Sequence, residues 1–403
     1  MSILHGKHIL LGITAGIAAY KTASLVRLFI KAGADVKVIM TPAAKDFITP
    51  LTLSTLSKNP VISSFTEEND DNAVWNNHVD LGLWADLFVV APVTANTLSK
   101  MAAGSSDNFL VATYLSAKCP VYFAPAMDLD MYKHPSTKAS LETLQSFGNI
   151  MIPATSGELA SGLVGEGRMA EPEAIVNHIE SHILQTMPLY GKTVLVTAGP
   201  TYEAIDPVRF IGNHSSGLMG FEIANHAAQL GAEVIYITGP THYKTDHSRI
   251  KTIPVVSAQE MYTQVHLYFS SVDVAILSAA VADYKPINQA TSKIKKASPT
   301  LSLELEKTKD ILASLGTTKS HQLLVGFALE TNDEIANAIK KLKSKNLDLI
   351  VLNSLNDEGA GFGGTTNKIT LIDKNLVQTE FPLKSKADVA IDIMNQLLKQ
   401  FNA

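Results

Sequence analysis

Short apolar runs without polar alternation, each followed by a helical pattern, recur along the chain and limit the folds open to it. The first run is His8–Ile13; a helical pattern then extends to about Ala32, and a second strand is expected over Val36–Met40. A strand that is apolar at every position is buried on both faces, which is typical of a parallel sheet covered by helices. We therefore expect an α/β fold with doubly wound, mainly parallel sheets, whose ligands bind at the carboxyl ends of the strands.

The same alternation of strand and helix continues through both halves of the chain. In the first half we expect further strands over Leu87–Ala91 and Val121–Ala124, and helices over Ala95–Ala102, Leu110–Ala117 and Ser136–Phe147. In the second half we expect strands over Thr193–Val196, Val234–Thr238, Val274–Ser278, Leu323–Phe327 and Leu349–Leu352, and helices over Leu218–Leu230, Ala258–Phe269, Asp333–Lys343 and Ala387–Gln400.

The length of the chain, 403 residues, favours two domains rather than one core. A short linker near Met187–Tyr190 places the boundary, so the expected domains are residues 1–189 and 190–403. Gly191–Thr197 echoes Gly6–Gly12 at the start of the first domain. A duplication is not needed to explain this echo, because any parallel strand that leads into a ligand loop has a similar sequence.

Composition excludes several classes of protein. Hydrophobic residues make up 46% and charged residues 18% of the chain, as in ordinary globular proteins, and the net charge of −5 gives no basic footprint for nucleic acid. Cys119 is the only cysteine, which excludes internal disulfides and thiolate metal clusters and fits a reducing compartment. Neither a signal-peptide pattern nor a bilayer-length apolar run is visible, so we expect a cytoplasmic protein with no membrane partner.

Polar and small residues crowd the start of the helix expected over Leu218–Leu230. Arg209 lies shortly upstream, and Asn213–Gly217, with the sequence Asn-His-Ser-Ser-Gly, leads directly into the helix. Backbone N–H groups and the helix dipole favour an anion at such a start. Helix capping alone remains an alternative, although one such residue would suffice for a cap. We interpret the segment as a phosphate site.

The loop after the first strand argues against a dinucleotide. Gly12–Gly16 has the form Gly-x-x-x-Gly rather than the Gly-x-Gly-x-x-Gly of a dinucleotide fold, and no complete Walker motif Gly-x-x-x-x-Gly-Lys-Ser/Thr occurs in the chain. An NAD-dependent dehydrogenase is therefore disfavoured. What the loop offers is Thr14 and Gly16, in a position to hold a single phosphate.

The whole string from Thr197 to Gly220 resembles the ligase half of the bifunctional phosphopantothenoylcysteine decarboxylase / phosphopantothenate-cysteine ligase family of coenzyme A synthesis. The resemblance covers nearly the whole chain, with its motifs in the right order. It implies two Rossmann-like domains, an N-terminal flavodoxin-like cysteine-decarboxylase fold and a C-terminal ligase domain.

Segments of the first half resemble those that hold FMN in cysteine decarboxylases. They are Gly12–Lys21, Met40–Ala44, Ala91–Asn96 and Ser105–Asn108. Thr41 and Thr94 could instead be plain helix caps. The FMN contacts that the resemblance implies are Gly12, Thr14, Gly16, Thr41, Ala91, Thr94, Ser106 and Asn108.

Three further matches concern the decarboxylase chemistry. His78 matches the active-site base of the family, which lies near the flavin where neighbouring subunits of a trimer meet. Pro125–Met131 matches Pro-x-Met-Asn-x-x-Met, with Asp128 at the asparagine that holds the substrate carboxylate. Ser156–Met169 contains four glycines and predicts a mobile lid. It resembles the substrate clamp of the family, with Ser161 in place of the usual cysteine acid.

Asp128 and Ser161 are two departures at the chemical centre, and we expect them to compensate each other. A carboxylate at Asp128 about 4 Å from that of the substrate would be repelled by roughly 4 kcal/mol at an effective dielectric of 20, which favours the protonated acid. Protonated Asp128 could donate a hydrogen bond as an asparagine does, and supply the proton that the cysteine normally gives. Cys119 cannot replace that cysteine, because it heads a strand as a small hydrophobe.

In the second half, Ser278–Tyr284 followed by Lys293–Lys296 resembles the ligase motif Ala-Ala-Val-Ala-Asp with its later Lys-Ile-Lys-Lys. By this match Asn213 steadies the acyl-nucleotide, and Asp283 and Lys293 contact the nucleotide. The lysine runs could equally be solvated loop or helix stripes. The other nucleotide contacts that the resemblance implies are Asp310, Ile311, Phe327, Lys341 and Lys345, although Lys309 replaces a usual proline.

The resemblance implies a bifunctional enzyme that binds CTP, FMN and Mg²⁺, with no metal ligand assigned among its side chains. Its substrates are 4′-phosphopantothenate, L-cysteine and then 4′-phosphopantothenoylcysteine, and it assembles as a homo-oligomer, with trimers joined into a dodecamer. In one alternative the N-terminal half is a flavin-binding regulatory or oligomerising module without decarboxylase activity. The presence of His78 argues against this alternative, whereas Asp128 and Ser161 favour it. A flavin-dependent reductase of unrelated substrates would leave the ligase motif unexplained.

Overall fold

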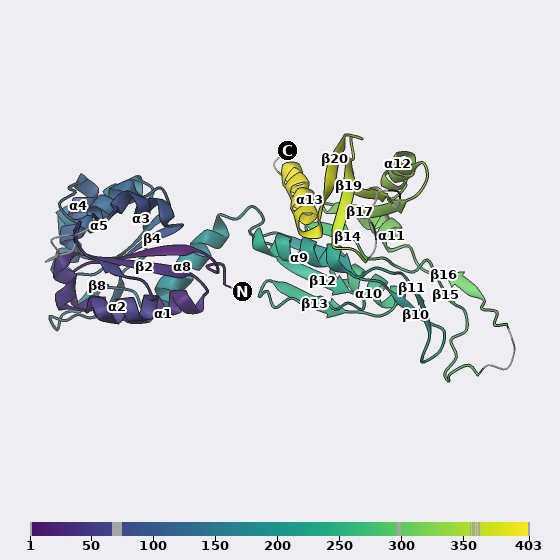
Figure 1. Cartoon of the computed structure of the whole chain (residues 1–403), viewed down its shortest axis with the longest axis horizontal. Helices are drawn as coiled ribbons and strands as arrows, with labels where there is room; N and C mark the ends of the chain where they lie inside the picture. Colours follow the sequence, from purple (N-terminus) through teal and green to yellow (C-terminus); the bar gives the residue numbers. More distant parts are fainter. Residues whose placement is uncertain are drawn as a thin grey trace. The chain divides into compact units, whose positions relative to one another are not determined.

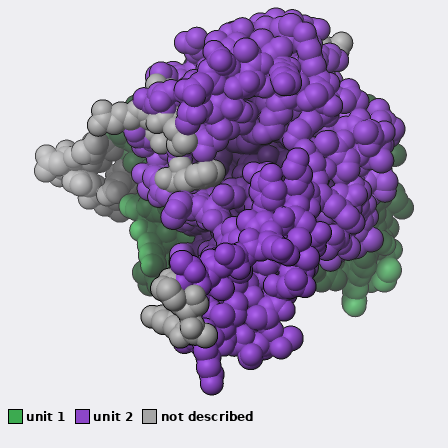
Figure 2. All heavy atoms as spheres, turned by 90° about the vertical axis from the view of Figure 1, so that its right-hand side faces the viewer, with its two compact units in different colours: residues 1–184 green, residues 185–403 purple. Residues whose placement is uncertain are grey.

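The computed structural model describes residues 2–66, 75–295, 300–354, 356, 359, 361 and 363–401. The chain divides into two compact units, residues 1–184 and 185–403 (Figures 1 and 2). Among the described residues, we find no helix with both the length and the apolar character needed to cross a bilayer. Lys296, the last lysine of the predicted ligase motif, lies outside the described residues.

Unit 1 contains a parallel sheet with strand order β3-β2-β1-β4-β5-β6. Its strands are β1 His8–Ile13, β2 Asp35–Met40, β3 Val61–Ile62, β4 Leu87–Val93, β5 Val121–Pro125 and β6 Ile150–Met151. The order reverses between β1 and β4, which is where ligands bind in sheets of this kind.

Helices cover both faces of this sheet (Figure 1). One core packs against α1 Thr22–Lys31, α2 Pro50–Ser57 and α8 Pro172–Gln185. The other core packs against α3 His78–Trp84, α4 Ala95–Ala103, α5 Phe109–Ser116 and α7 Pro135–Ser146. The strands between these layers are buried on both sides, which is why they are apolar without alternation.

Unit 2 has an eight-stranded sheet in the order β13-β12-β9-β14-β17-β18-β19-β20. The parallel strands are β9 Thr193–Ala198, β12 Glu233–Thr238, β13 Ile250–Pro254, β14 Val274–Leu277, β17 Leu323–Glu330 and β18 Leu349–Ser354. The last two strands, β19 Thr366–Asp373 and β20 Gln378–Ser385, are antiparallel. One face carries α9 Leu218–Gln229 and α13 Lys386–Phe401, and the other α10 Ala258–Phe269, α11 Ile311–Thr318 and α12 Glu334–Ser344.

Small elements stand at the edges of the two sheets. The hairpins are β7 Thr155–Glu158 with β8 Val164–Arg168, β10 Tyr202–Ala204 with β11 Phe210–Gly212, and β15 Tyr284–Pro286 with β16 Leu305–Lys307. The short helices are η1 Ile17–Lys21, η2 Pro42–Asp46 and α6 Leu129–Lys133.

The predicted α/β class with two mainly parallel sheets is confirmed. Several elements were not predicted, among them the helices α2, α3, α8 and α11 and the antiparallel pair β19–β20. Every residue of β20 is exposed or half-buried, so the sequence has no buried apolar face from which this strand could be predicted. The glycine-rich segment expected as a lid forms the hairpin β7–β8.

Candidate active sites

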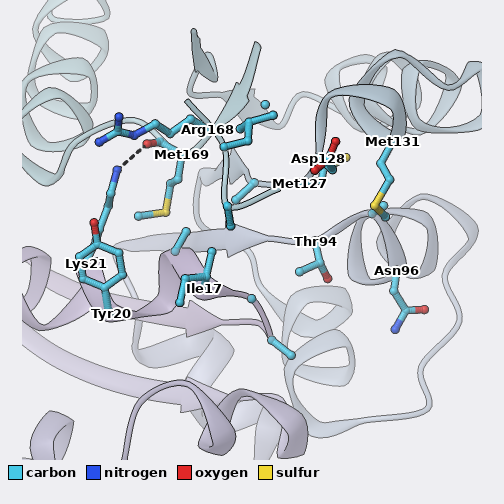
Figure 3. Close-up of a pocket in the computed structure, with 18 of the residues that line it drawn as sticks. Ile17, Tyr20, Lys21, Thr94, Asn96, Met127, Asp128, Met131, Arg168 and Met169 are labelled. Atoms are coloured by element: carbon cyan, nitrogen blue, oxygen red, sulfur yellow. Dashed lines mark hydrogen bonds between the residues drawn. The ribbon is translucent and has the colours of Figure 1, made fainter. Parts of the chain in front are cut away.

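The main cavity of unit 1 has a volume of about 790 Å³ and lies at the carboxyl ends of β1, β4 and β5. Its walls include Gly16, Thr94 and Asp128, together with Arg168 from the hairpin strand β8. The close-up shows Lys21 and Arg168 on one side and Thr94, Asp128 and Met131 on the other (Figure 3). A cavity of this size suits a cofactor or a drug-sized ligand.

Thr14 joins two strand ends beneath this cavity. Its hydroxyl is fully buried, donates to Pro92 O at 2.8 Å and accepts from Thr94 N at 3.0 Å. Gly12 lies within β1, where an added Cβ would come within 3.0 Å of Phe88. Of the predicted FMN contacts, Gly16 and Thr94 therefore line the cavity, whereas Thr14 and Gly12 shape the loop and the core under it.

Two buried polar atoms near the strand ends have no hydrogen-bond partner among the described residues: Thr41 Oγ1 and His78 Nδ1. His78 begins α3, and the rings of Phe65 and Phe109 meet its imidazole edge-on, with centroids 5.9 and 6.5 Å away. Buried polar atoms are normally paired, so an unpaired one in a native structure calls for a ligand, a water or an ion. Both residues were predicted to act at the flavin, and neither lines the main cavity in this chain.

The remaining predicted flavin contacts lie in β4 and at the start of α5. Ala91 is buried within β4 and Ser106 is exposed. The Asn108 side chain caps α5 by accepting from Val111 N at 3.1 Å. A flavin role for these three residues stays a prediction.

The hairpin β7–β8 is fixed at its base to the loop that carries Asp128. Met127 N donates to Gly167 O at 3.0 Å, and a Cβ on Gly167, whose φ is 142°, would lie 2.5 Å from Met127 O. Only glycine permits this approach. Ser161 lies in the turn of the hairpin, is exposed and does not line the cavity, so the structure does not bring Asp128 and Ser161 together.

Basic groups supply positive charge to the same cavity, which sequence reasoning missed. Lys21 is buried, and its ammonium donates to Met169 O at 3.0 Å and to Glu171 at 2.9 Å. Arg168 also binds Glu171, at 2.9 Å. The hydrogen bond from Lys21 is the main cause that lowers the pKa of Glu171. A single carboxylate thus holds two cationic side chains, and both of these side chains belong to residues that line the cavity.

Unit 2 contains two adjoining cavities of about 340 and 540 Å³, which share Asp283, Phe327 and Lys341. The smaller one opens onto the start of α9 and is lined by Asn213 and the following loop. The larger one is lined by Asp310, Ile311 and Lys345 among others. The space-filling view shows the surface of unit 2 hollowed near the middle of one face (Figure 2).

Asn213 is oriented by the backbone of the loop after β14. Its Nδ2 donates to Ala280 O at 3.0 Å and to Val281 O at 3.3 Å, which leaves Oδ1 free to accept from a ligand. Across the same cavity, Asn353 Oδ1 is buried and has no partner among the described residues. Two amide groups therefore present acceptors to this cavity.

The start of α9 is tightly seated on β9. Gly217 has a φ of 83°, and an added Cβ on Gly220 would lie 2.5 Å from Ala198 Cβ. Ser215 and Ser216 hydroxyls accept weakly from Gly217 N and Leu218 N, at 3.3 and 3.4 Å. An anion bound by the backbone N–H groups at this helix start stays a prediction.

Lys341 of α12 and Lys345, which directly follows this helix, border the cavities of unit 2. Lys341 Nζ donates to Phe327 O at 2.7 Å, and burial lowers the pKa of its ammonium. Lys345 pairs with Asp310 at 2.7 Å. Burial is the largest single influence on Asp310 and acts to raise its pKa, but the hydrogen bonds from Lys345 and Ala313 N, together with the charges of Lys345 and Lys341, outweigh it and the pKa is lowered. Asp310 also caps α11, and Ile311 is a buried core residue of that helix.

Lys293 is exposed and lines neither cavity, so the structure does not bring it to the other predicted residues. Its loop is nevertheless anchored. Buried Asp206 accepts from Arg209 Nε at 3.0 Å and from Ile294 N at 3.1 Å, and Arg209 Nη2 donates to Ile294 O at 3.0 Å. The spacing Asp-Pro-x-Arg in the sequence suits such a turn, but the partner loop could not be predicted.

Asp206→Asn should lower the stability of unit 2 at neutral pH. The stability of the variant should also change less than that of wild type as the pH falls. The hydrogen bond from Arg209 is the main cause that holds the pKa of Asp206 far below its usual 3.8. A lowered folded-state pKa adds stability that is present above the unfolded value and lost as pH falls through the folded value. The difference in melting temperature between wild type and variant, followed by circular dichroism, should therefore shrink from pH 7 to about pH 2. Exposed Asp246→Asn is the control, and a constant difference would contradict the interpretation.

Comparison with known proteins matches each unit to a family. The flavoprotein family matches residues 2–184, and the DNA/pantothenate metabolism flavoprotein C-terminal domain matches residues 189–401. The coenzyme A biosynthesis bifunctional protein CoaBC of Bacillus subtilis (strain 168) is 44% identical over 98% of this chain and 97% of its own length. The chain belongs to the family of bifunctional coenzyme A biosynthesis proteins.

In this bifunctional family a flavoprotein decarboxylase domain is joined to a ligase domain, and the two sheets described above correspond to them. The protein of the same name from Vibrio cholerae serotype O1 (strain ATCC 39315 / El Tor Inaba N16961) is also 44% identical, over 99% of this chain and 100% of its own. The prediction of a bifunctional enzyme of coenzyme A biosynthesis is thereby confirmed at the level of the family.

A further relative carries a different name. A cysteine/cysteine sulfinic acid decarboxylase from an unknown prokaryotic organism is 54% identical to this chain, over 87% of it and 99% of its own length. The name of this relative refers to decarboxylation of cysteine. The first half of this chain resembles cysteine decarboxylases, so both point to the same type of reaction.

Proposed function

We propose that unit 2, in the predicted domain 190–403, joins 4′-phosphopantothenate to L-cysteine with CTP. A carboxylate oxygen of the pantothenate attacks the α-phosphorus of CTP, and pyrophosphate leaves. The cysteine amine then attacks the acyl carbon; CMP leaves as the amide forms and the nitrogen loses a proton. The observation that supports this most is the position of Asn213, whose side chain is fixed beside the start of α9 in a cavity it shares with Asp283 and Lys341.

Each group in this site has a task in the proposed reaction. The N–H groups at the start of α9 and the ammonium of Lys341 offset negative charge on the phosphates. The free Oδ1 of Asn213 accepts a hydrogen bond from the activated substrate. The described side chains include no group of three or more His, Cys, Asp or Glu residues that could hold a metal. Mg²⁺ would therefore arrive on the phosphates of the nucleotide, as is common for this ion.

We further propose that unit 1, in the predicted domain 1–189, decarboxylates the 4′-phosphopantothenoylcysteine that unit 2 makes. The unpaired Thr41 Oγ1, together with Gly16 and Thr94 at the cavity, fits a bound FMN. When bound, FMN supplies the oxidation of the cysteinyl thiol and, after CO₂ is lost, the return of a hydride that gives 4′-phosphopantetheine. Lys21 and Arg168 then attract the substrate carboxylate into the cavity that Asp128 also lines, and His78 transfers a proton if it reaches the cavity of a neighbouring subunit.

FMN should copurify with the protein, and FAD should not. The loop after β1 has no Gly-x-Gly-x-x-Gly turn for a pyrophosphate, so a single phosphate is the group that fits it. The visible spectrum of the purified protein, with identification of the released flavin by mass, is the measurement. Protein that is colourless and takes up no added FMN would contradict the flavin assignment.

The ligase proposal is tested separately, by pyrophosphate release from CTP in the presence of both phosphopantothenate and cysteine. Release that requires both acceptors supports the proposal, whereas no release, or release that does not depend on them, would contradict it. We also expect a homo-oligomer in the cytoplasm, as the resemblance implied.

The second candidate for unit 1 is decarboxylation of free cysteine or its sulfinic acid. The 54% identical relative of that name favours it, as do Asp128 and Ser161, which depart from the pattern of the coenzyme A enzymes. Mass analysis of the products from phosphopantothenoylcysteine, cysteine and cysteine sulfinic acid, each supplied alone, separates the candidates. Phosphopantetheine from the first substrate supports the main proposal, and accumulated enethiol would mean that Asp128 fails to deliver the final proton. No turnover of any of the three would favour a regulatory flavin module.

A further inference from the structure

Lys386, the first residue of α13, is a buried cation in unit 2 that the proposed reaction does not yet use. Its side chain is 5% exposed and lines the same cavity as Asn213 and the start of α9. Nζ makes a long hydrogen bond to Gly361 O at 3.3 Å, and no carboxylate among the described residues pairs with it. Lys384, two residues earlier, instead pairs with Asp392 at 2.8 Å.

The position of Lys386 is unfavourable for the protein by itself. A buried ammonium loses its hydration, and one backbone carbonyl replaces only a small part of it. The first turn of a helix also carries the positive end of the helix dipole, which repels a cation. Burial accordingly lowers the pKa of the Lys386 ammonium. An anion in the cavity would offset both costs.

The other walls of the cavity indicate which anion fits. The start of α9 presents backbone N–H groups, and Lys341 brings a second ammonium from α12. Asp283 is the carboxylate among the described lining residues. Two lysines and a helix start, on separate elements, suit a ligand with several negative groups spread over some distance. A polyphosphate meets this requirement better than a single carboxylate does.

We propose that Lys386 binds the polyphosphate of the nucleotide in the ligase site and retains the pyrophosphate as it leaves. This inference rests on the proposed ligase function and adds a residue to it. The strand β20 and the helix α13 then belong to the active site, because β20 leads directly into Lys386, which lines the same cavity as the start of α9.

Titration calorimetry with inorganic pyrophosphate tests the proposal directly. Lys386→Met removes the charge and keeps most of the volume, so the dissociation constant should rise by roughly 10- to 100-fold, as for the loss of one charge-assisted hydrogen bond. Lys384→Met is the matched control, since Lys384 is paired with Asp392 and does not line the cavity. Equal affinity in wild type and Lys386→Met, or no pyrophosphate binding by wild type, would overturn the proposal.

Thermal unfolding separates this role from a structural one. Without ligand, Lys386→Met should melt at or above the wild-type temperature, because an apolar side chain replaces a buried charge that has no carboxylate partner in the part of the chain that the structure describes. The increase in melting temperature caused by pyrophosphate should be smaller than in wild type. Lys386→Gln, which can still donate to Gly361 O, should behave in the same way. A lower melting temperature with an unchanged pyrophosphate response would assign Lys386 to folding alone.

Steady-state kinetics of the full-length enzyme tests the role of Lys386 independently of the ligase proposal. In Lys386→Met the KM for CTP should rise while the KM for phosphopantothenate stays near the wild-type value. A rise confined to phosphopantothenate would refute the polyphosphate assignment, although the ligase activity of wild type would stand. If wild type had no ligase activity but its pyrophosphate binding still depended on Lys386, the proposed reaction would be refuted. The assignment of Lys386 to an anion site would stand.

Discussion

Replacing Asn213 by aspartate should lower the rate of pyrophosphate release at least about 10³-fold. The substitution sets a carboxylate against Ala280 O and Val281 O, where the amide now donates. It also adds a negative charge to a cavity that must hold phosphates. Repulsion between two charges 4 Å apart is about 4 kcal/mol at an effective dielectric of 20, which corresponds to roughly three orders of magnitude in rate.

The control for this charge change is Asn375→Asp, which places the same new charge on an exposed turn of unit 2. The control should retain the wild-type rate, and both variants should melt near the wild-type temperature because Asn213 is itself exposed. A rate in Asn213→Asp within about tenfold of wild type would remove the residue from the reaction, by the same electrostatic reasoning.

Lys293→Gln should lower the same rate by at least the roughly 10²-fold typical of losing one charge-stabilising donor. Lys293 is exposed and its loop is anchored through Asp206 and Ile294, so the variant should fold normally. Because Lys293 does not line the cavity of its own chain, the effect requires the loop to close on the nucleotide or to reach a second subunit. Neighbouring Lys295→Gln, equally exposed, is the matched control; equal rates in the two variants would contradict a specific role for Lys293.

The sequence predicted those strands that are buried on both faces. The strand β1 was located because it is apolar without alternation, and β9 because Thr193–Val196 is rich in residues that favour strands; both strands are buried at nearly every position. The strand β20 is exposed or half-buried throughout, so no periodic feature distinguished it from a loop. Burial supplies the signal that sequence reasoning detects, and edge strands carry little of it.

Individual site residues were harder to predict, because a residue type does not reveal where its side chain points. Thr14 stands at a strand end as a phosphate ligand would, yet its hydroxyl is used between Pro92 and Thr94. Lys384 and Lys386 are two residues apart and chemically identical, but Lys384 pairs with half-buried Asp392 and Lys386 lines a cavity. Tertiary packing separates such residues, and it depends on parts of the chain far away in sequence.

During synthesis on the ribosome, the residues that line the two cavities become available at different times. Every residue that lines the cavity of unit 1 lies between Ala15 and Met169, so that cavity can be complete before any of unit 2 is synthesised. The small cavity of unit 2 draws on residues from Asn213 to Lys386, and Lys386 is the first residue of α13. A nascent chain that terminates before α13 would therefore keep the first cavity intact and lack a wall of the second.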